Sequence, residues 1–316
     1  MAIQGHSTRI HCLIIYSMTI VSIFNTSANA VCPISSLTNP QAAMKVMFCD
    51  NPMWNTDYSY RVLPLMSESI MERGREFVHY LEVEASNSSV WNSISRRTSY
   101  LCLFGYNDYD QSSLITAIEV GIIGETCPKL GFLEIRNLNI KNITKNTFKD
   151  LNSLAILLLG NNSITYLPKD VFEYLRNIIW ISLDGTRIQT ISPQHFCICT
   201  KLQFLQIRSS NLSNINDMAD VQFPEQRCNF KLLSFTLDSN IFLNMTSAIF
   251  KHYSMHGVLS IANTSLSELK QDYFNGLENV LFLSLGYNRI KIIPQDVFNA
   301  TRNSLQGIRL STTLKI

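Results

Sequence analysis

The sequence predicts a repeat solenoid of the α/β class, in which short parallel strands stack side by side and loops or short helices run back along the opposite face. The first observation behind this prediction is a fixed period. Phenylalanines recur at intervals of 24 residues four times and of 54 residues once, at Phe148, Phe172, Phe196, Phe250, Phe274 and Phe298. The second observation is that repeat starts align at this period from residue 130 to residue 316.

The clearest repeat is residues 154–177, where every position of the pattern LxxLxLxxNxIxxLPxxxFxxL is filled. Alternation of inward Leu157 and Leu159 with their neighbours is typical of a strand with one face buried. Parallel strands need a crossover, and the rest of the repeat provides it. The recurring phenylalanines are therefore expected to stack as a column, a structural spine, on the convex side.

An amide side chain follows the strand in three repeats, at Asn162, Asn240 and Asn288. Such an amide can donate to and accept from backbone groups that have no other partner. Hydroxyl side chains take this place in other repeats, which predicts weaker but similar turns at Thr186, Ser210, Thr264 and Thr313.

This register resembles the extracellular leucine-rich repeat proteins, the family that includes the ectodomains of Toll-like receptors and Slit-type guidance proteins. The resemblance covers residues 130–316 and implies a curved horseshoe with its parallel strands on the concave face. It leaves the ligand open, because the fold alone does not settle function.

The chain divides into three expected regions. Residues 1–30 are predicted to be a signal peptide, since Arg9 precedes an apolar run and small residues end the segment. The rival interpretation, a signal anchor, needs a longer apolar run. Residues 31–129 are expected to form an N-terminal cap region, either irregular or with degenerate repeats, and residues 130–316 the repeats. The last repeat is incomplete and has no cysteine cap, so further sequence is expected downstream.

Seven cysteines remain after removal of the signal peptide. The candidates for disulfides are Cys32, Cys49, Cys102 and Cys127 before the repeats, with unassigned pairing, and Cys199 with Cys228 on adjacent turns. The bridge to Cys228 leaves either Cys197 or Cys199 over, buried or available to link chains into an oligomer. A zinc site of His195, Cys197, Cys199 and Cys228 is the less favoured alternative, so neither a metal nor a cofactor is predicted.

Outward positions of the strands give the candidate ligand-binding surface. The third repeat position carries an apolar stripe, Phe132, Ile156, Trp180 and Phe204, beside Leu158 and bordered by the polar residues Glu134, Arg136, Asp184, Gln206 and Arg208. Apolar anchors inside a polar rim are typical of protein interfaces. The alternative is that bulky side chains here only pack against their neighbours on adjacent strands.

The repeat that starts at Leu202 is six residues longer than its neighbours, and the surplus lies between Asn216 and Arg227. It is expected to loop out of the solenoid, either as a functional loop or as a tolerated insertion.

Motifs and composition argue for binding and against catalysis. No nucleophile elbow, phosphate loop or metalloprotease pattern occurs, so an enzyme is not predicted. The formal net charge is +2 and no Lys/Arg run or stripe appears, so nucleic acid is not an expected partner. No segment after the signal peptide predicts a membrane span. Glycosylation is predicted at seven sequons, Asn87, Asn142, Asn161, Asn211, Asn244, Asn263 and Asn299.

We therefore predict an extracellular recognition module that binds a protein ligand or co-receptor in innate immunity, adhesion or receptor signalling. It is either secreted or the extracellular part of a membrane receptor. The alternative is a secreted inhibitor or a matrix scaffold protein.

Overall fold

The computed structural model describes residues 91–92, 94–105, 112–213, 228, 230–242 and 250–310, and the backbone of the strands at 10–16, 19–25, 47–50 and 79–84. The chain divides into two compact units, residues 1–78 and 79–316. In the first unit, strands β1 (Ile10–Tyr16), β2 (Thr19–Asn25) and β3 (Met47–Asp50) form an antiparallel sheet in the order β2-β1-β3. The first two strands lie within the predicted signal peptide, which stays a prediction.

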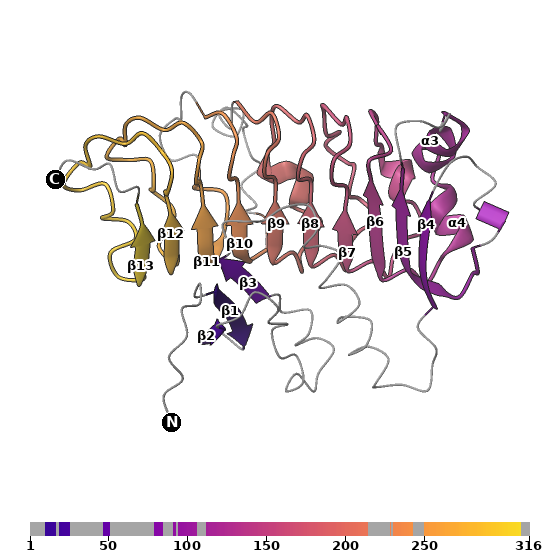
Figure 1. Ribbon diagram of the computed structural model, residues 1–316, viewed down its shortest axis with the longest axis horizontal. Helices are drawn as coiled ribbons and strands as arrows, with labels where there is room; N and C mark the ends of the chain where they lie inside the picture. The colour runs from indigo at the N-terminus through magenta and orange to yellow at the C-terminus, as the bar shows by residue number, and fades with distance from the viewer. Residues whose placement is uncertain are drawn as a thin grey trace. The chain divides into compact units, whose positions relative to one another are not determined.

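The second unit is a solenoid built on one ten-stranded parallel sheet, whose strands follow one another in chain order (Figure 1). The predicted fold is confirmed. The strands are β4 (His79–Glu84), β5 (Thr98–Phe104), β6 (Phe132–Arg136), β7 (Ile156–Leu158), β8 (Trp180–Ser182), β9 (Phe204–Gln206), β10 (Leu232–Thr236), β11 (Met255–Ser260), β12 (Phe282–Ser284) and β13 (Gly307–Arg309).

The sheet continues on the N-terminal side of residue 130, where β5 pairs with β6 in the register of the later repeats, Tyr100 opposite Phe132. Two short helices, α3 (Ser112–Glu119) and α4 (Ile122–Thr126), join these strands. Helix α4 lies close to the next crossover, because a Cβ at Gly124 would collide with the Lys149 carbonyl. The boundaries of the expected cap region remain a prediction.

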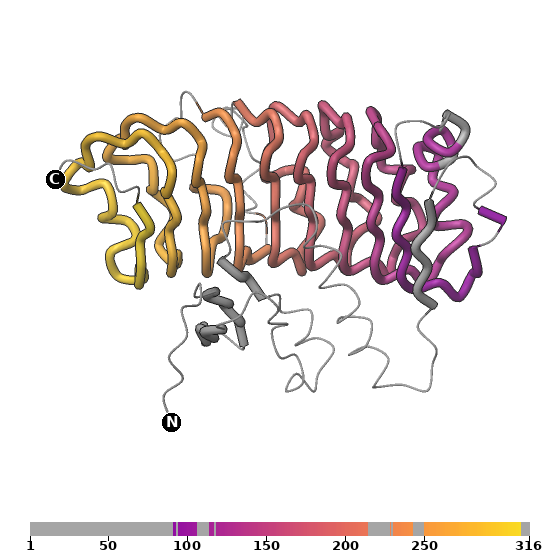
Figure 2. Tube along the Cα trace, viewed as in Figure 1, coloured from indigo at the N-terminus to yellow at the C-terminus, as the bar shows by residue number. Residues whose placement is uncertain are grey.

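The crossovers contain little regular helix. They are mostly turns, with two 3₁₀ segments, η3 (Lys145–Phe148) and η4 (Pro193–Phe196). Figure 2 shows the resulting coil, in which each strand is followed by a loop that returns to the start of the next strand. A fixed return of this kind places the same repeat position of successive turns side by side.

The interior is formed by those recurring positions. Leu157 and its counterparts on the neighbouring strands are 0 to 1% exposed from β5 to β12. On the convex side, the phenylalanine rings stack, with centroids 6.0 Å apart for Phe148 and Phe172, 5.6 Å for Phe172 and Phe196, and 5.6 Å for Phe274 and Phe298. Stacked aromatic pairs of this separation stabilise the turn-to-turn contact beyond their burial.

The amide after the strand bonds to two turns at once. Asn288 donates to the carbonyls of Ile261 and Leu285 at 2.7 and 3.1 Å, and its oxygen accepts from the Thr264 and Leu266 amides at 2.8 and 3.2 Å. Asn162 makes the equivalent set with the turn before it. These amides satisfy buried backbone groups that parallel strands leave unpaired where they end.

A left-handed residue precedes this position in each described repeat. The φ angle is between 49° and 66° at Asn137, Asn161, Gly185, Ser209, Ser239, Asn263 and Tyr287. Only Gly185 adopts this conformation without steric cost, although Asn tolerates it better than most residues. The turn is thus imposed by the repeat as a whole and not by the local residue.

Candidate recognition surface

A row of side chains crosses the outward face of the sheet from strand to strand. Its members are opposite one another in register: Tyr100, Phe132, Ile156, Trp180, Phe204, Ser234, Val258 and Phe282. Its first five members are apolar or aromatic, and Ser234 interrupts it. The predicted stripe is therefore contiguous across β6 to β9, as the strand register requires.

The stripe is more buried than an open binding face would be. Phe132 is 7% exposed, Ile156 3%, Leu158 9% and Phe204 0%, whereas Trp180 is partly exposed. Lateral packing contributes, since Tyr100 stacks on Phe132 at 4.1 Å between centroids and Trp180 lies 6.3 Å from Phe204. Ring-to-ring packing between strands accompanies this burial, and Trp180 is the member of the stripe with accessible surface.

Trp180 also carries an unmet hydrogen bond. Its Nε1 is buried and has no acceptor. Leaving a buried donor unsatisfied costs about 1–3 kcal/mol.

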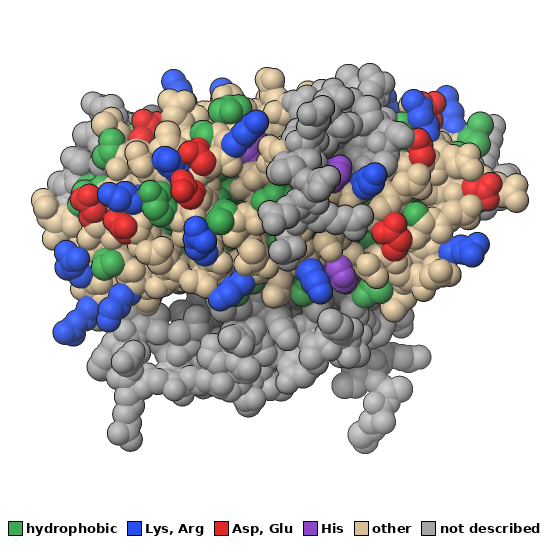
Figure 3. Space-filling view, turned by 180° about the vertical axis from the view of Figure 1, so that it is seen from behind, with side chains coloured by type: hydrophobic (Ala, Val, Ile, Leu, Met, Phe, Trp, Pro, Cys, Tyr) green, Lys and Arg blue, Asp and Glu red, His purple; other side chains and the backbone are tan. Residues whose placement is uncertain are grey.

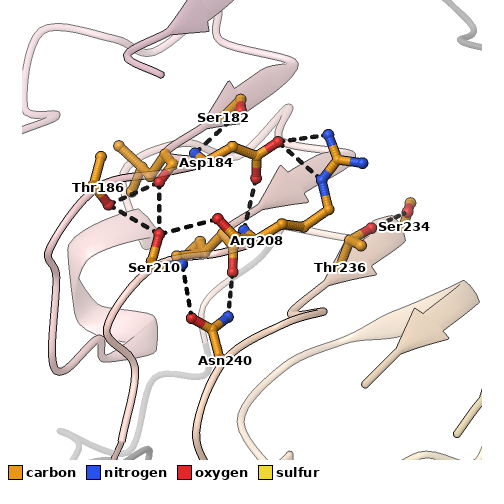
Figure 4. Close-up of polar contacts among 10 residues, drawn as sticks. Ser182, Asp184, Thr186, Arg208, Ser210, Ser234, Thr236 and Asn240 are labelled. Carbon is orange, nitrogen blue, oxygen red and sulfur yellow. Dashed lines mark hydrogen bonds and ion pairs between the residues drawn. The ribbon is translucent and has the colours of Figure 1, made fainter. Parts of the chain in front are cut away.

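Beside the stripe, an acid and a base from adjacent strands form a close ion pair (Figure 4). The guanidinium of Arg208 donates to Asp184 Oδ2 from Nε at 2.9 Å and from Nη2 at 2.6 Å, and the Arg208 backbone amide donates to Asp184 Oδ1 at 2.7 Å. Both side chains are about a quarter exposed. A charge-assisted pair with this forked geometry fixes both side chains at the rim of the strand face.

Asp238 extends this row on the next strand and was not among the predicted site residues. Its Oδ1 accepts from Ser260 Oγ at 2.6 Å and from the Ala262 amide at 2.8 Å. It occupies the same repeat position as Asp184 and Arg208, so the period of the sequence was the signal that could have found it. The row alternates in sign along the solenoid.

Burial and neighbouring charge shift the pKa values of this row. Burial raises the pKa of the Asp238 carboxyl above its ordinary range, against the hydrogen bonds and the Arg208 charge that lower it. Burial acts to lower the pKa of the Arg208 guanidinium, but Asp184 and Asp238 together raise it. The Arg208 guanidinium therefore stays charged under all ordinary conditions.

A hydroxyl and amide network lies beneath the ion pair. Ser210 Oγ donates to the Leu183 carbonyl at 3.0 Å and lies 3.1 Å from Thr186 Oγ1, and the Ser210 amide donates to Asn240 Oδ1 at 3.1 Å. Figure 4 shows these groups below Asp184 and Arg208. The network supports the turn that positions Arg208.

The remaining predicted rim residues lie on β6 and β9. Arg136 Nη1 lies 3.4 Å from Glu134 Oε1, and the Arg136 guanidinium carbon lies 5.2 Å from the centroid of the Phe104 ring. Glu134, Arg136 and Gln206 are 4 to 5% exposed. These three residues are therefore structural neighbours of the stripe more than accessible contacts.

The disulfide prediction was wrong in its partner. Cys228 bonds to Cys197, with Cα atoms 4.6 Å apart, and not to Cys199. Cys199 is a buried free thiol because it stands at the leucine position three residues after the column phenylalanine, the place that Leu151 and Leu175 fill elsewhere. Burial raises the pKa of the Cys199 thiol to about 12.

Two of the four cysteines before the repeats also differ from expectation. Cys127 occupies the same core position as Cys199, and it is a buried free thiol whose pKa burial raises to about 11. Cys102 lies in β5, and its Sγ is 3.5 Å from Glu134 Oε2. Neither forms the predicted disulfide. Cys49 lies in β3, and Cys32 is outside the described residues.

His195 serves the fold and not a metal. Its Nδ1 accepts from the Ser192 amide at 2.9 Å, and its Nε2 lies 2.9 Å from the Leu167 carbonyl. With Cys197 in a disulfide, the alternative zinc set is lost. Within the described residues, no group of three His, Cys, Asp or Glu side chains could hold a metal ion.

Five predicted sequons lie in the described residues, and the asparagine of each is exposed: Asn142, Asn161, Asn211, Asn263 and Asn299. The first four follow the C-terminal ends of strands. Asn87, Asn244 and the surplus segment 216–227 lie outside the described residues. Glycosylation at these sites stays a prediction.

Comparison with known proteins gives the same class as the geometry. Residues 128–188 and 153–212 match the family model for the leucine rich repeat. Toll-like receptor 3 from Bos taurus is 23% identical over 252 residues, which are 72% of this chain and 27% of the receptor. Lumican from Bos taurus is 26% identical over 176 residues, which are 55% of this chain and 48% of lumican. A crystal structure of a TLR13-ssRNA13 complex covers 72% of this chain at 16% identity, with a TM-score of 0.46.

The repeated strand, turn and aromatic column thus define a solenoid of the leucine-rich repeat kind, and the family model matches it over residues 128–212. Among such proteins, it resembles Toll-like receptor ectodomains. The chain spans about a quarter of the length of Toll-like receptor 3 and about half that of lumican. No helix of the described residues is long and apolar enough to cross a bilayer.

Proposed function

We propose that this chain is an extracellular recognition module that binds a protein ligand through the strand face around Trp180. The observation that carries the proposal is the partly exposed Trp180 ring, which lies between buried apolar neighbours and beside the Asp184–Arg208 pair. A ligand side chain placed over β8 would cover the accessible part of the ring.

The surroundings of Trp180 fit a protein anchor. Ile156 and Phe204 flank it on the adjacent strands and hold the ring at a fixed place, so little side-chain entropy is lost on binding. Asp184 and Arg208 lie at the rim, partly exposed and already oriented by each other. A tryptophan centred in apolar surroundings with a charged rim is typical of binding hot spots.

The relatives support an extracellular and immune or matrix setting for this module. Toll-like receptor 3 is similar to this chain over 72% of its length, and lumican over 55%. The exposed sequons are consistent with passage through the secretory route. The same proposal includes a non-catalytic role without a cofactor, as a receptor in innate immunity. The second candidate is a secreted inhibitor or matrix scaffold protein, because of the similarity to lumican.

Two substitutions of Trp180 separate recognition from packing. The ligand is captured with the secreted chain from its natural extracellular fluid, and its affinity is then measured by biolayer interferometry. Trp180→Phe keeps a smaller aromatic ring, so the ligand loses contact area and we expect binding about tenfold weaker. Because the substitution also removes an unsatisfied buried N–H, stability should be unchanged or slightly higher. Trp180→Ala should abolish binding. Unchanged affinity for Trp180→Phe alongside lost stability would refute the proposed anchor.

A further inference from the structure

The edge of the sheet at which the strands begin is basic. In β5, β6, β8, β9 and β10, the residues just before the strand include six exposed cations, Arg96, Arg97, Lys129, Arg176, Lys201 and Lys231. We call this set the basic edge. Figure 3 shows Lys and Arg side chains along the corresponding lower edge of the repeat unit.

These charges are not neutralised locally. Lys201 Nζ donates to the amide oxygen of Asn177 at 2.6 Å, a neutral partner. None of the six forms an ion pair with a carboxylate of the described residues. From β5 onward, the first acid at these repeat positions is Glu278, which lies two strands beyond Lys231. With a net charge of +2 for the whole chain, this edge concentrates positive charge.

The spacing of the charges is set by the solenoid. Neighbouring strands lie about 4.8 Å apart, so the basic edge extends for roughly 24 Å from β5 to β10. Its cations form one line with about one charge for each strand. A flexible linear polyanion with separated anionic groups can follow such a line. A nucleic-acid duplex presents one charge per about 1.7 Å over a broad cylinder, which fits a single line less well.

Among the described residues, the same edge lacks the features that other partners need. The exposed large hydrophobic side chains near strand ends, Tyr166, Ile241, Tyr287 and Ile292, lie on the opposite edge. Without aromatic platforms, the basic edge offers no stacking to single-stranded nucleic acid, and without apolar anchors it offers no hot spot to a protein.

The opposite edge also carries the described sequons that follow strands, from Asn142 to Asn263. Glycans there would crowd that edge and leave the basic edge open. We therefore propose that the basic edge binds a sulfated polysaccharide chain laid along the solenoid. This site is separate from the Trp180 surface and adds a second ligand to the proposed function.

The test uses the secreted, glycosylated chain and heparin as the probe. Lys129→Gln, Lys201→Gln and Lys231→Gln are combined, and binding to immobilised heparin is measured at several salt concentrations. We expect affinity to fall about tenfold or more and the slope of log Kd against log salt to fall by about three, because three ion contacts are lost. Equal melting temperatures would show that the fold is retained.

The matched control removes three exposed cations from the opposite edge, Lys141→Gln, Arg187→Gln and Lys291→Gln. The heparin affinity of this control should stay within about twofold of wild type, because it loses the same number of charges but from the edge opposite the basic edge. Desulfated heparin should not bind. The proposal would be overturned if the control lost as much heparin affinity as the triple variant, or if the wild type did not bind heparin. It would also be overturned if desulfated heparin bound equally well, or if duplex RNA of matched length bound more tightly. The Trp180→Phe variant should bind heparin normally, so the two proposals fail separately.

Discussion

His195 links the protonation of one side chain to the packing of the crossover. Its Nδ1 accepts from the Ser192 amide and its Nε2 faces the Leu167 carbonyl, contacts that suit the neutral ring with its proton on Nε2. Burial lowers the pKa of His195, aided by the charge of Lys169, and the backbone hydrogen bonds only partly oppose this. A second proton would place two donors against each other at Nδ1.

The stability of the repeats should therefore depend on pH through this group. The unfolded chain takes up a proton near pH 6.5, whereas the native ring resists it to lower pH. The contribution of His195 to the free energy of unfolding is fully present above about pH 6.5. It falls as the pH drops toward the lowered pKa of His195 in the native state. Urea unfolding of the wild type and of His195→Gln between pH 7.5 and 5 would measure this component. An unchanged pH slope in the variant would contradict it.

Cys199 shows what a single repeat position decides. The pattern FxxL predicts that the third residue after Phe196 points into the core, so the sequence itself contained the reason that Cys199 is not the partner of Cys228. Proximity to the repeat start suggested a bridge, but inward or outward direction settles which thiol can reach the neighbouring turn. Cys197, one residue after the phenylalanine, is only half-buried.

The long repeat is the element that departs most from its neighbours. It has no phenylalanine at the column position between Phe196 and Phe250. In its place, the Cys197–Cys228 disulfide joins the crossovers on either side, and Phe230 packs near Tyr253 at 6.2 Å between ring centroids. The bridge thus supplies a turn-to-turn connection where the aromatic column is interrupted.

Removing this bridge should have a distinct signature. Cys197→Ser should lower the free energy of unfolding by about 2–4 kcal/mol and leave the Cys228 thiol open to labelling in the native state. Cys199→Ser should cost about 1–3 kcal/mol through its buried hydroxyl, with Cys228 still protected. Mass spectrometry after thiol labelling distinguishes the two. Labelling of Cys228 in Cys199→Ser but not in Cys197→Ser would reverse the assignment.

The edges of the sheet were poorly predicted for a related reason. Apart from the adjacent Arg96 and Arg97, the cations of the basic edge are one or more repeats apart in the chain, so no longer Lys/Arg run marks them. Only the stacking of strands brings them into line. Asp238 escaped notice in the same way, because its neighbours in the charged row come from other repeats.

For the repeat unit as a whole, the period alone predicted the solenoid, since each turn can bury its leucines only against another turn. The sheet begins earlier than residue 130, because β5 keeps the register without the full motif. Burial of the strand face was not predictable from the period. Alternation assigns Phe132 and Phe204 to the outward row, but how closely rings pack across neighbouring strands depends on their three-dimensional arrangement.

The aromatic column gives the last prediction. Phe172 is 0% exposed and stacks on Phe148 and Phe196, whereas Phe298 is partly exposed and stacks on Phe274. Phe172→Ala should therefore cost about 3–5 kcal/mol and Phe298→Ala roughly half of that. In a solenoid, each turn depends mainly on its neighbours, so hydrogen exchange should quicken in β6 to β9 for the first variant and in β12 and β13 for the second. Uniform quickening across all strands in both variants would show that the unit unfolds as one block, against the nearest-neighbour account.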